Sequence, residues 1–113
     1  MKEIKAILQP VVLEAVITAL KQIPDLPGIT VSEVKGFGRT RAADAEDKVS
    51  EGVHEYARKM KLEIVVPDNL LEPTLLAIQT HAHRGRPGDG KIFVITVDDI
   101  LKIRTGERGE TAV

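Results

Sequence analysis

The sequence Arg84-Gly-Arg-Pro-Gly-Asp-Gly-Lys-Ile-Phe-Val-Ile-Thr-Val97 joins a glycine-rich turn directly to an apolar, β-branched run. The run is typical of a strand, and the glycines and proline before it are typical of a tight turn. Backbone N–H groups in such a turn can converge on an anion, and Arg84, Arg86 and Lys91 add positive charge. The stretch therefore predicts either a phosphate-binding turn at the edge of a sheet or an ordinary hairpin with surface charge.

The spacing of this turn is similar to that of a nucleotide-binding P-loop, but the motif is incomplete. Gly85, Gly90 and Lys91 occupy its glycine and lysine positions. Ile92 stands where a P-loop has the serine or threonine that holds magnesium, and a strand follows where a P-loop has a helix. We therefore expect a turn that is not a P-loop.

The rest of the chain alternates between strand-like and helix-like patterns. In residues 2–9, Ile4, Ala6 and Leu8 fall on one face of a predicted strand. The segment 40–61 has no clear period and is predicted to be a long loop, which in small domains is often functional. The other predicted elements are a helix from Leu13 to about Pro24, strands at 29–34, 62–66 and 91–97, a helix from Asp68 or Asn69 to about His81, a helical turn at 98–101, a short strand at 102–105 and a polar tail.

The predicted order β-α-β-β-α-β indicates an α+β, ferredoxin-like fold, with two helices on one face of an antiparallel sheet. The strands at 62–66 and 91–97 are apolar on both faces, so we expect oligomerisation to cover the second face. The two phenylalanines, Phe37 and Phe93, are assigned to the core.

Composition limits the classes of function. The 113 residues suffice for one domain, and a net charge of -1 with 3% aromatic residues argues against a nucleic-acid partner. The sequence has no cysteine, which excludes disulfides and thiolate chemistry. Because it has neither a membrane-spanning apolar run nor a signal-peptide pattern, we expect a cytoplasmic protein without direct membrane insertion.

The acidic and histidine motifs do not predict a catalytic or metal site. His81 and His83 are two residues apart, and such side chains do not face each other on a helix. Asp98 and Asp99 stand where a helix cap is expected. No nucleophile and base can be paired by spacing, so we expect neither a metal, nor a catalytic residue, nor an enzyme.

Four segments together resemble the PII signal-transduction family: Val31-Ser-Glu-Val-Lys-Gly-Phe-Gly-Arg39, Leu62-Glu-Ile-Val-Val-Pro-Asp68, Gly88-Asp-Gly-Lys-Ile-Phe-Val94 and Ile103-Arg-Thr-Gly-Glu107. With their spacing they make 1–113 a single PII-like domain. The resemblance implies a homotrimer with an adenine-nucleotide site in each cleft between subunits. It also implies three loops, namely a T-loop at about 38–60 that docks on a target transporter or enzyme, a B-loop at about 84–91 and a C-loop at about 102–110.

The resemblance also implies the residues that bind the nucleotide, which would be ATP, ADP or AMP with none permanently bound. Glycines of the T-loop and B-loop would let phosphates approach the backbone, and cations from separate loops would clamp them. Ile7, Glu63 and Val65 match positions around the adenine. The other matching residues are Gly36, Gly38, Arg39, Thr40, Gly88, Asp89, Gly90, Lys91, Lys102 and Arg104.

The T-loop departs from the family pattern. Thr40 replaces a glutamine that helps to hold magnesium and 2-oxoglutarate, while Lys59 matches the lysine that pairs with that effector. A smaller anion is therefore expected near Thr40, Arg41 and Lys59. Ser50 aligns with a serine that some members have phosphorylated, although an ordinary exposed serine is the better explanation, because Glu51 and Gly52 depart from the surrounding motif.

These features favour a non-catalytic regulator similar to the PII-like branch associated with carboxysomes and inorganic carbon. Such a regulator would bind adenine nucleotides and respond to bicarbonate. The first alternative is a classical nitrogen regulatory PII protein that senses 2-oxoglutarate with ATP. The second, from another class, is a weak ATPase.

Overall fold

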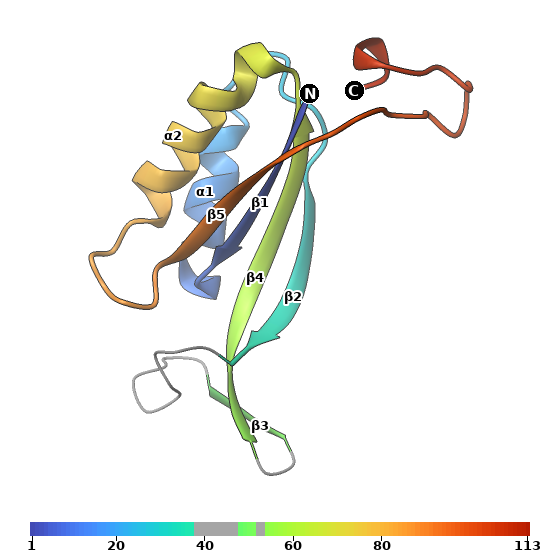
Figure 1. Cartoon of the computed structure of the whole chain (residues 1–113). Coiled ribbons are helices and arrows are strands. Elements are labelled where there is room, and N and C mark those ends of the chain that lie inside the picture. Colours follow the sequence, from blue (N-terminus) through green and yellow to red (C-terminus); the bar gives the residue numbers. More distant parts are fainter. Residues whose placement is uncertain (38–47, 52–53) are drawn as a thin grey trace.

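The computed structural model describes residues 1–37, 48–51 and 54–113, with side chains described for 1–37 and 56–113. Helices α1 and α2 and the sheet form two layers (Figure 1). The elements are β1 Lys2–Leu8, the 3-10 helix η1 Pro10–Val12, α1 Leu13–Leu20, β2 Thr30–Gly36, β3 Lys48–Glu51, β4 His54–Val66, η3 Asp68–Leu70, α2 Leu71–Ala82, β5 Gly90–Thr96 and η4 Glu110–Ala112.

The sheet has the strand order β2-β4-β1-β5, and every described pair is antiparallel. Both α-helices lie on the same face of this sheet (Figure 1). Strand β3 lies off this path and pairs with residues 54–57 at the start of β4. The predicted α+β, ferredoxin-like arrangement is therefore confirmed for the single chain.

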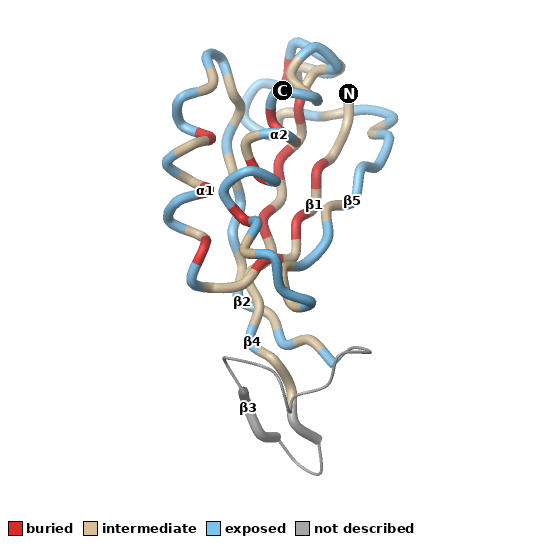
Figure 2. Tube along the Cα trace, turned by 90° about the vertical axis from the view of Figure 1, so that its left-hand side faces the viewer, coloured by how far each residue is buried: buried red, intermediate tan, exposed pale blue. Residues whose placement is uncertain are grey.

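The hydrophobic core lies between the helices and the sheet (Figure 2). Ile4, Ala6 and Leu8 point into it, as their alternation predicts, because side chains along a strand point to opposite faces in turn. Opposite them in β4 the same alternation buries Leu62, Ile64 and Val66, and the helices contribute chiefly Val16, Leu20 and Ile78.

The other face of the sheet carries both apolar and charged side chains. In β5, Phe93 and Ile95 are 48% and 41% exposed. In β4, Lys61 and Glu63 form an ion pair of 3.6 Å. The prediction that both phenylalanines belong to the core is wrong in the single chain, since Phe37 is 52% exposed.

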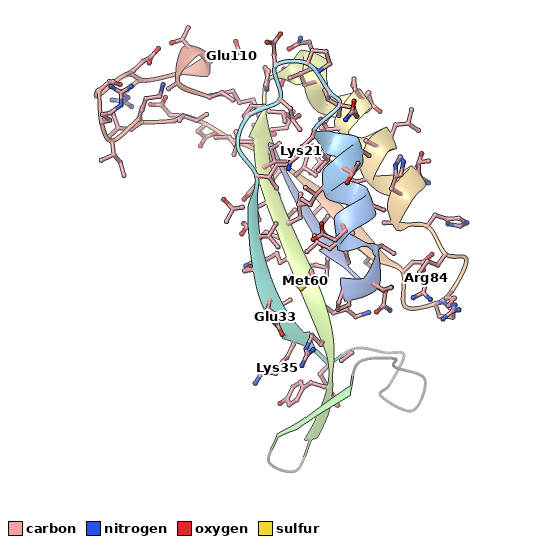
Figure 3. The ribbon with its side chains drawn as sticks, turned by 180° about the vertical axis from the view of Figure 1, so that it is seen from behind. Lys21, Glu33, Lys35, Met60, Arg84 and Glu110 are labelled. Atoms are coloured by element: carbon pink, nitrogen blue, oxygen red, sulfur yellow. The ribbon has the colours of Figure 1, made fainter. Side chains whose placement is uncertain are left out.

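Strand β4 begins at His54, well inside the segment predicted to be a loop. Residues 54–61 form strand because β2 and β3 pair with them, although their charged sequence gives no strand signal. At this end Phe37 meets Tyr56 edge-on, with ring centroids 5.9 Å apart, and the ammonium of Lys35 lies 5.9 Å from the Tyr56 ring. Figure 3 shows Lys35 beside this end of the sheet.

The chain after β5 forms a projecting arm, and neither the helical turn predicted at 98–101 nor the strand predicted at 102–105 is present (Figure 1). Leu101 and Arg108 form an isolated antiparallel bridge around a turn. Asp99 does not cap a helix. Its carboxylate accepts hydrogen bonds from the Ile100 N–H at 2.8 Å and from the guanidinium of Arg108, and this guanidinium, more than the Ile100 N–H, lowers the pKa of Asp99.

The second helix begins differently from the prediction. A 3-10 turn precedes α2, and its N-cap makes no side-chain hydrogen bond. Asp68 instead accepts a hydrogen bond of 3.0 Å from the N-terminal amine of Met1, and this bond lowers the pKa of Asp68. Pro73 lies in the first turn of α2, where its missing N–H costs little. Across the described ranges, no helix combines the length and apolar character needed to cross a membrane.

Candidate functional site

The predicted B-loop is a tight turn that leads directly into β5. The Asp89 N–H donates to the Arg86 carbonyl at 3.1 Å, which closes a four-residue turn with Pro87 at its second position. Gly85 and Gly90 have φ values of 78° and 108°, a region that favours glycine. Pro87 therefore shapes the turn, and Gly85 and Gly90 adopt backbone conformations that favour glycine.

The carboxylate of Asp89 organises this loop from within. One oxygen accepts hydrogen bonds of 2.9 Å from the backbone N–H groups of both Arg84 and Gly85. The bond from Arg84 is the main reason that the pKa of Asp89 lies below its usual value. These two amides, which the sequence suggests for binding an external anion, are therefore already occupied by a carboxylate of the loop.

Acid should release this internal contact. The lowered pKa means that the Asp89 bonds are fully present above the ordinary carboxyl value of 3.8 and are lost as the pH falls through the lower folded-state pKa. Proton NMR should show the Arg84 and Gly85 amides shifting together with a midpoint below 3.8. Asp89→Asn should abolish this titration, whereas Asp98→Asn should leave it intact. A midpoint above 3.8 would contradict the assignment.

Two side chains from other elements hold the Gly88 carbonyl. The Gln9 side-chain amide donates to it at 2.6 Å, and the Lys59 ammonium donates to it at 3.0 Å. Lys59, predicted to bind an effector anion, thus lies against the B-loop. Gln9 is absent from the residues that the sequence predicts, because a polar residue beside Pro10 at the end of a strand carries no distinctive signal.

Four predicted nucleotide contacts share the open face of the sheet. Ile7 is paired with Lys61 on one side and with Lys91 on the other, next to the B-loop. Glu63 and Val65 follow at alternate positions along β4, so they point to the same face and lie progressively farther from the loop. The structure therefore brings Ile7 and Lys91 together. Glu63 lies two residues farther along β4 than Lys61, the β4 partner of Ile7.

The remaining T-loop residues are only partly within the described structure. Gly36 ends β2, and a methyl group added there would lie 3.5 Å from Lys59 Cγ, an ordinary contact distance. Ser50 lies in β3, paired with Glu55. The predicted contacts Gly38, Arg39, Thr40 and Arg41 lie outside the described residues.

The two basic residues of the predicted C-loop lie far from the B-loop of the same chain. Lys102 pairs with Glu107 at 3.6 Å within the turn of the arm, and Arg104 is exposed near its tip. The arm follows the end of β5 opposite to Gly90 (Figure 1). Figure 3 shows the same separation between Arg84 on the loop and Glu110 after the arm. One chain therefore carries two basic regions at opposite ends.

His81 and His83 make separate contacts and do not form a metal site together. His81 Nδ1 lies 2.9 Å from the Ala77 carbonyl one turn earlier, while His83 Nδ1 lies 3.7 Å from Asp89. Among the residues with described positions, no group of three or more histidine and acidic side chains is placed to hold a metal ion.

Comparison with known proteins identifies the family. The family description "Nitrogen regulatory protein P-II" matches residues 1–107. The chain belongs to the PII family. Over all 113 residues, and over the whole of each relative, it is 45% identical to the nitrogen regulatory protein P-II of Azospirillum brasilense and 46% identical to that of Rhodospirillum rubrum. The corresponding value for nitrogen regulatory protein P-II 1 of Escherichia coli is 41%.

Membership of PII confirms the predicted resemblance and places the chain in a family of regulatory proteins. It agrees with the expectation of a regulator rather than an enzyme. The names of these relatives favour the classical nitrogen regulatory alternative over the carbon-specific interpretation, which the comparisons do not support.

Proposed function

We propose that this PII protein is a non-catalytic regulator in nitrogen metabolism that binds ATP, ADP or AMP between the subunits of a homotrimer and controls a target through its T-loop. The observation that carries the proposal is the separation of the two basic regions. Lys91 begins β5, whereas Lys102 and Arg104 lie on the arm beyond its other end. They can act on one phosphate group only if they come from different chains.

The exposed apolar side chains support assembly. Phe93 and Ile95 lie on the open face of the edge strand β5, and Ile103 on the arm is 97% exposed. Burying such groups against other chains is favourable by about 25 cal/mol per Å² of apolar surface. The trimer would thus cover the open sheet face and bring the arm of one subunit to the cleft of its neighbour.

Lys91→Ala and Arg104→Ala should each weaken nucleotide binding. Each substitution removes a charge-assisted contact of about 1.5–3 kcal/mol, equivalent to about 10- to 100-fold in affinity. Calorimetry with ATP, ADP and AMP measures the effect, and light scattering should show that both variants remain trimers. Lys21→Ala is a matched control, since this exposed lysine directly follows α1 and belongs to none of the predicted loops.

Mixed trimers test whether the two cations come from different chains. When Lys91→Ala and Arg104→Ala chains are unfolded together and reassembled, some clefts should receive Lys91 from one chain and Arg104 from the other. A fraction of sites should then regain wild-type affinity, although neither parent has it. If both parents bind as the wild type does, or if mixing restores no site, the proposed inter-subunit site is incorrect.

The effector separates the nitrogen and carbon interpretations. In a nitrogen regulator, 2-oxoglutarate with magnesium should raise ATP affinity, and ATP should raise 2-oxoglutarate affinity by the same factor. Titrations with 2-oxoglutarate and with bicarbonate, for the wild type and Thr40→Gln, measure this coupling. We expect coupling to 2-oxoglutarate and a stronger coupling in Thr40→Gln. A response to bicarbonate alone would contradict the nitrogen interpretation and support the carbon-specific one.

A further inference from the structure

We infer that Gln9 is a positioning residue that keeps the B-loop in its binding conformation even when Lys59 leaves the Gly88 carbonyl. The inference rests on the proposed nucleotide site and concerns its regulation. Lys59 is charged, so an added anion would attract it, whereas Gln9 is neutral and directly follows the central strand β1. Gln9 would therefore retain the loop whenever Lys59 is drawn to an effector.

The contact geometry places both donors on one acceptor. Gln9 Nε2 and Lys59 Nζ lie 2.6 Å and 3.0 Å from the Gly88 carbonyl oxygen. A carbonyl oxygen has two lone pairs and can accept both bonds. Strand pairing brings the donors together, because Leu8 at the end of β1 pairs with Met60, Gln9 directly follows Leu8, and Lys59 is the neighbour of Met60 in β4.

The backbone of Gln9 is well fixed for this role. Its φ of -67° and ψ of 140° are extended, which is the conformation that a following proline favours. Its carbonyl accepts a hydrogen bond of 3.2 Å from the N–H of Val12, the last residue of η1. The neighbouring residue Leu8 pairs with Gly90, so the end of β1 next to Gln9 is also joined to the end of the loop.

The side chain of Gln9 limits the space beside Gly88. A methyl group added at Gly88 would lie 2.5 Å from Gln9 Nε2 but 3.7 Å from Lys59 Nζ. The φ of Gly88 lies outside the left-handed region, so the backbone conformation there does not itself require glycine. A methyl group there would instead have to displace the end of the Gln9 side chain, and so disturb its bond to the Gly88 carbonyl.

This arrangement predicts a specific form of coupling. With Gln9 present, an anion that attracts Lys59 leaves one hydrogen bond on the Gly88 carbonyl. Without Gln9, Lys59 is the one described side-chain donor left on the Gly88 carbonyl, so the same anion would oppose nucleotide binding. Gln9 thus sets how strongly the state of Lys59 affects the loop.

A double-mutant cycle tests the inference on the full-length protein. Gln9→Met keeps the length of the side chain but removes its donor, and should weaken ATP binding by about 2- to 10-fold, the equivalent of one hydrogen bond. Gly88→Ala should weaken binding further in the wild type, because its methyl group displaces Gln9. In the Gln9→Met background, whose flexible side chain can yield, the additional loss should be smaller. Gln22→Ala, which alters an exposed glutamine beyond the far end of α1, should change nothing.

Hydrogen exchange of the Asp89 amide, which donates to Arg86 within the loop, provides a readout that needs no nucleotide. Exchange should be faster in Gln9→Met than in the wild type, and Lys59→Met should accelerate it more in the Gln9→Met background than alone. If the wild type binds no nucleotide, the proposed function fails, and exchange still decides the role of Gln9 in the loop. Unchanged exchange in Gln9→Met, or strictly additive effects in both cycles, would overturn the inference.

Discussion

Gly90→Ala should destabilise the protein by about 3 kcal/mol or more, since a strained backbone costs about 1–3 kcal/mol and overpacking costs about the same again. Gly90 has a φ of 108° and pairs with Leu8, and an added methyl group would lie 1.8 Å from the Ile7 carbonyl oxygen. Backbone atoms cannot rotate away as a side chain can. The end of β5 must therefore separate from β1, and nucleotide affinity should be lost with the B-loop.

Gly28→Ala is the matched control for this substitution. No atom lies within 4 Å of a methyl group placed at Gly28, and its φ is not in the left-handed region. Its free energy of unfolding in urea should remain within about 0.5 kcal/mol of the wild type. If Gly90→Ala unfolded at the same urea concentration as Gly28→Ala, the described approach of β5 to β1 would be incorrect.

Leu20→Ala should lower the free energy of unfolding by about 2–5 kcal/mol, the usual cost of truncating a fully buried leucine. Leu20 ends α1 and is 0% exposed, in contact with the core formed by both helices and the sheet. Leu76→Ala is the control, because Leu76 lies in α2 and is 64% exposed. Urea denaturation at a fixed protein concentration should separate the two variants. Equal effects would contradict the described core.

The sequence predicts those parts of the fold that local patterns determine. Alternation of Ile4, Ala6 and Leu8 identifies the buried face of β1, and the periodicity of α1 identifies its core residues. The prediction of a loop at 54–61 is wrong because these residues form strand by pairing with β2 and β3, which their own charged sequence does not indicate. The prediction of a helical turn in the arm is wrong because the carboxylate of Asp99 binds Arg108, nine residues later, instead of capping a helix.

In the candidate site, too, local patterns predict the turn but not the contacts between residues that are distant in the sequence. The glycine and charge pattern of residues 84–91 predicts a tight turn, and two of its glycines have the expected positive φ. The pattern does not reveal that Asp89 occupies two of the loop's amides, nor that Gln9, 79 residues away along the chain, holds the loop's carbonyl. Such contacts depend on which strands are neighbours in the sheet. Residue spacing along the chain contains no such information.

The separation of Lys91 from Lys102 and Arg104 along β5 also has a genetic consequence. If each cleft takes one cation set from each of two chains, a chain that lacks both sets damages both clefts that it borders, including the halves contributed by intact neighbours. A mutant allele of this kind would then be dominant when expressed beside the wild type. An allele that prevents the chain from folding removes it from assembly and would be recessive. The two inheritance patterns would distinguish loss of the site from loss of the fold inside a living cell.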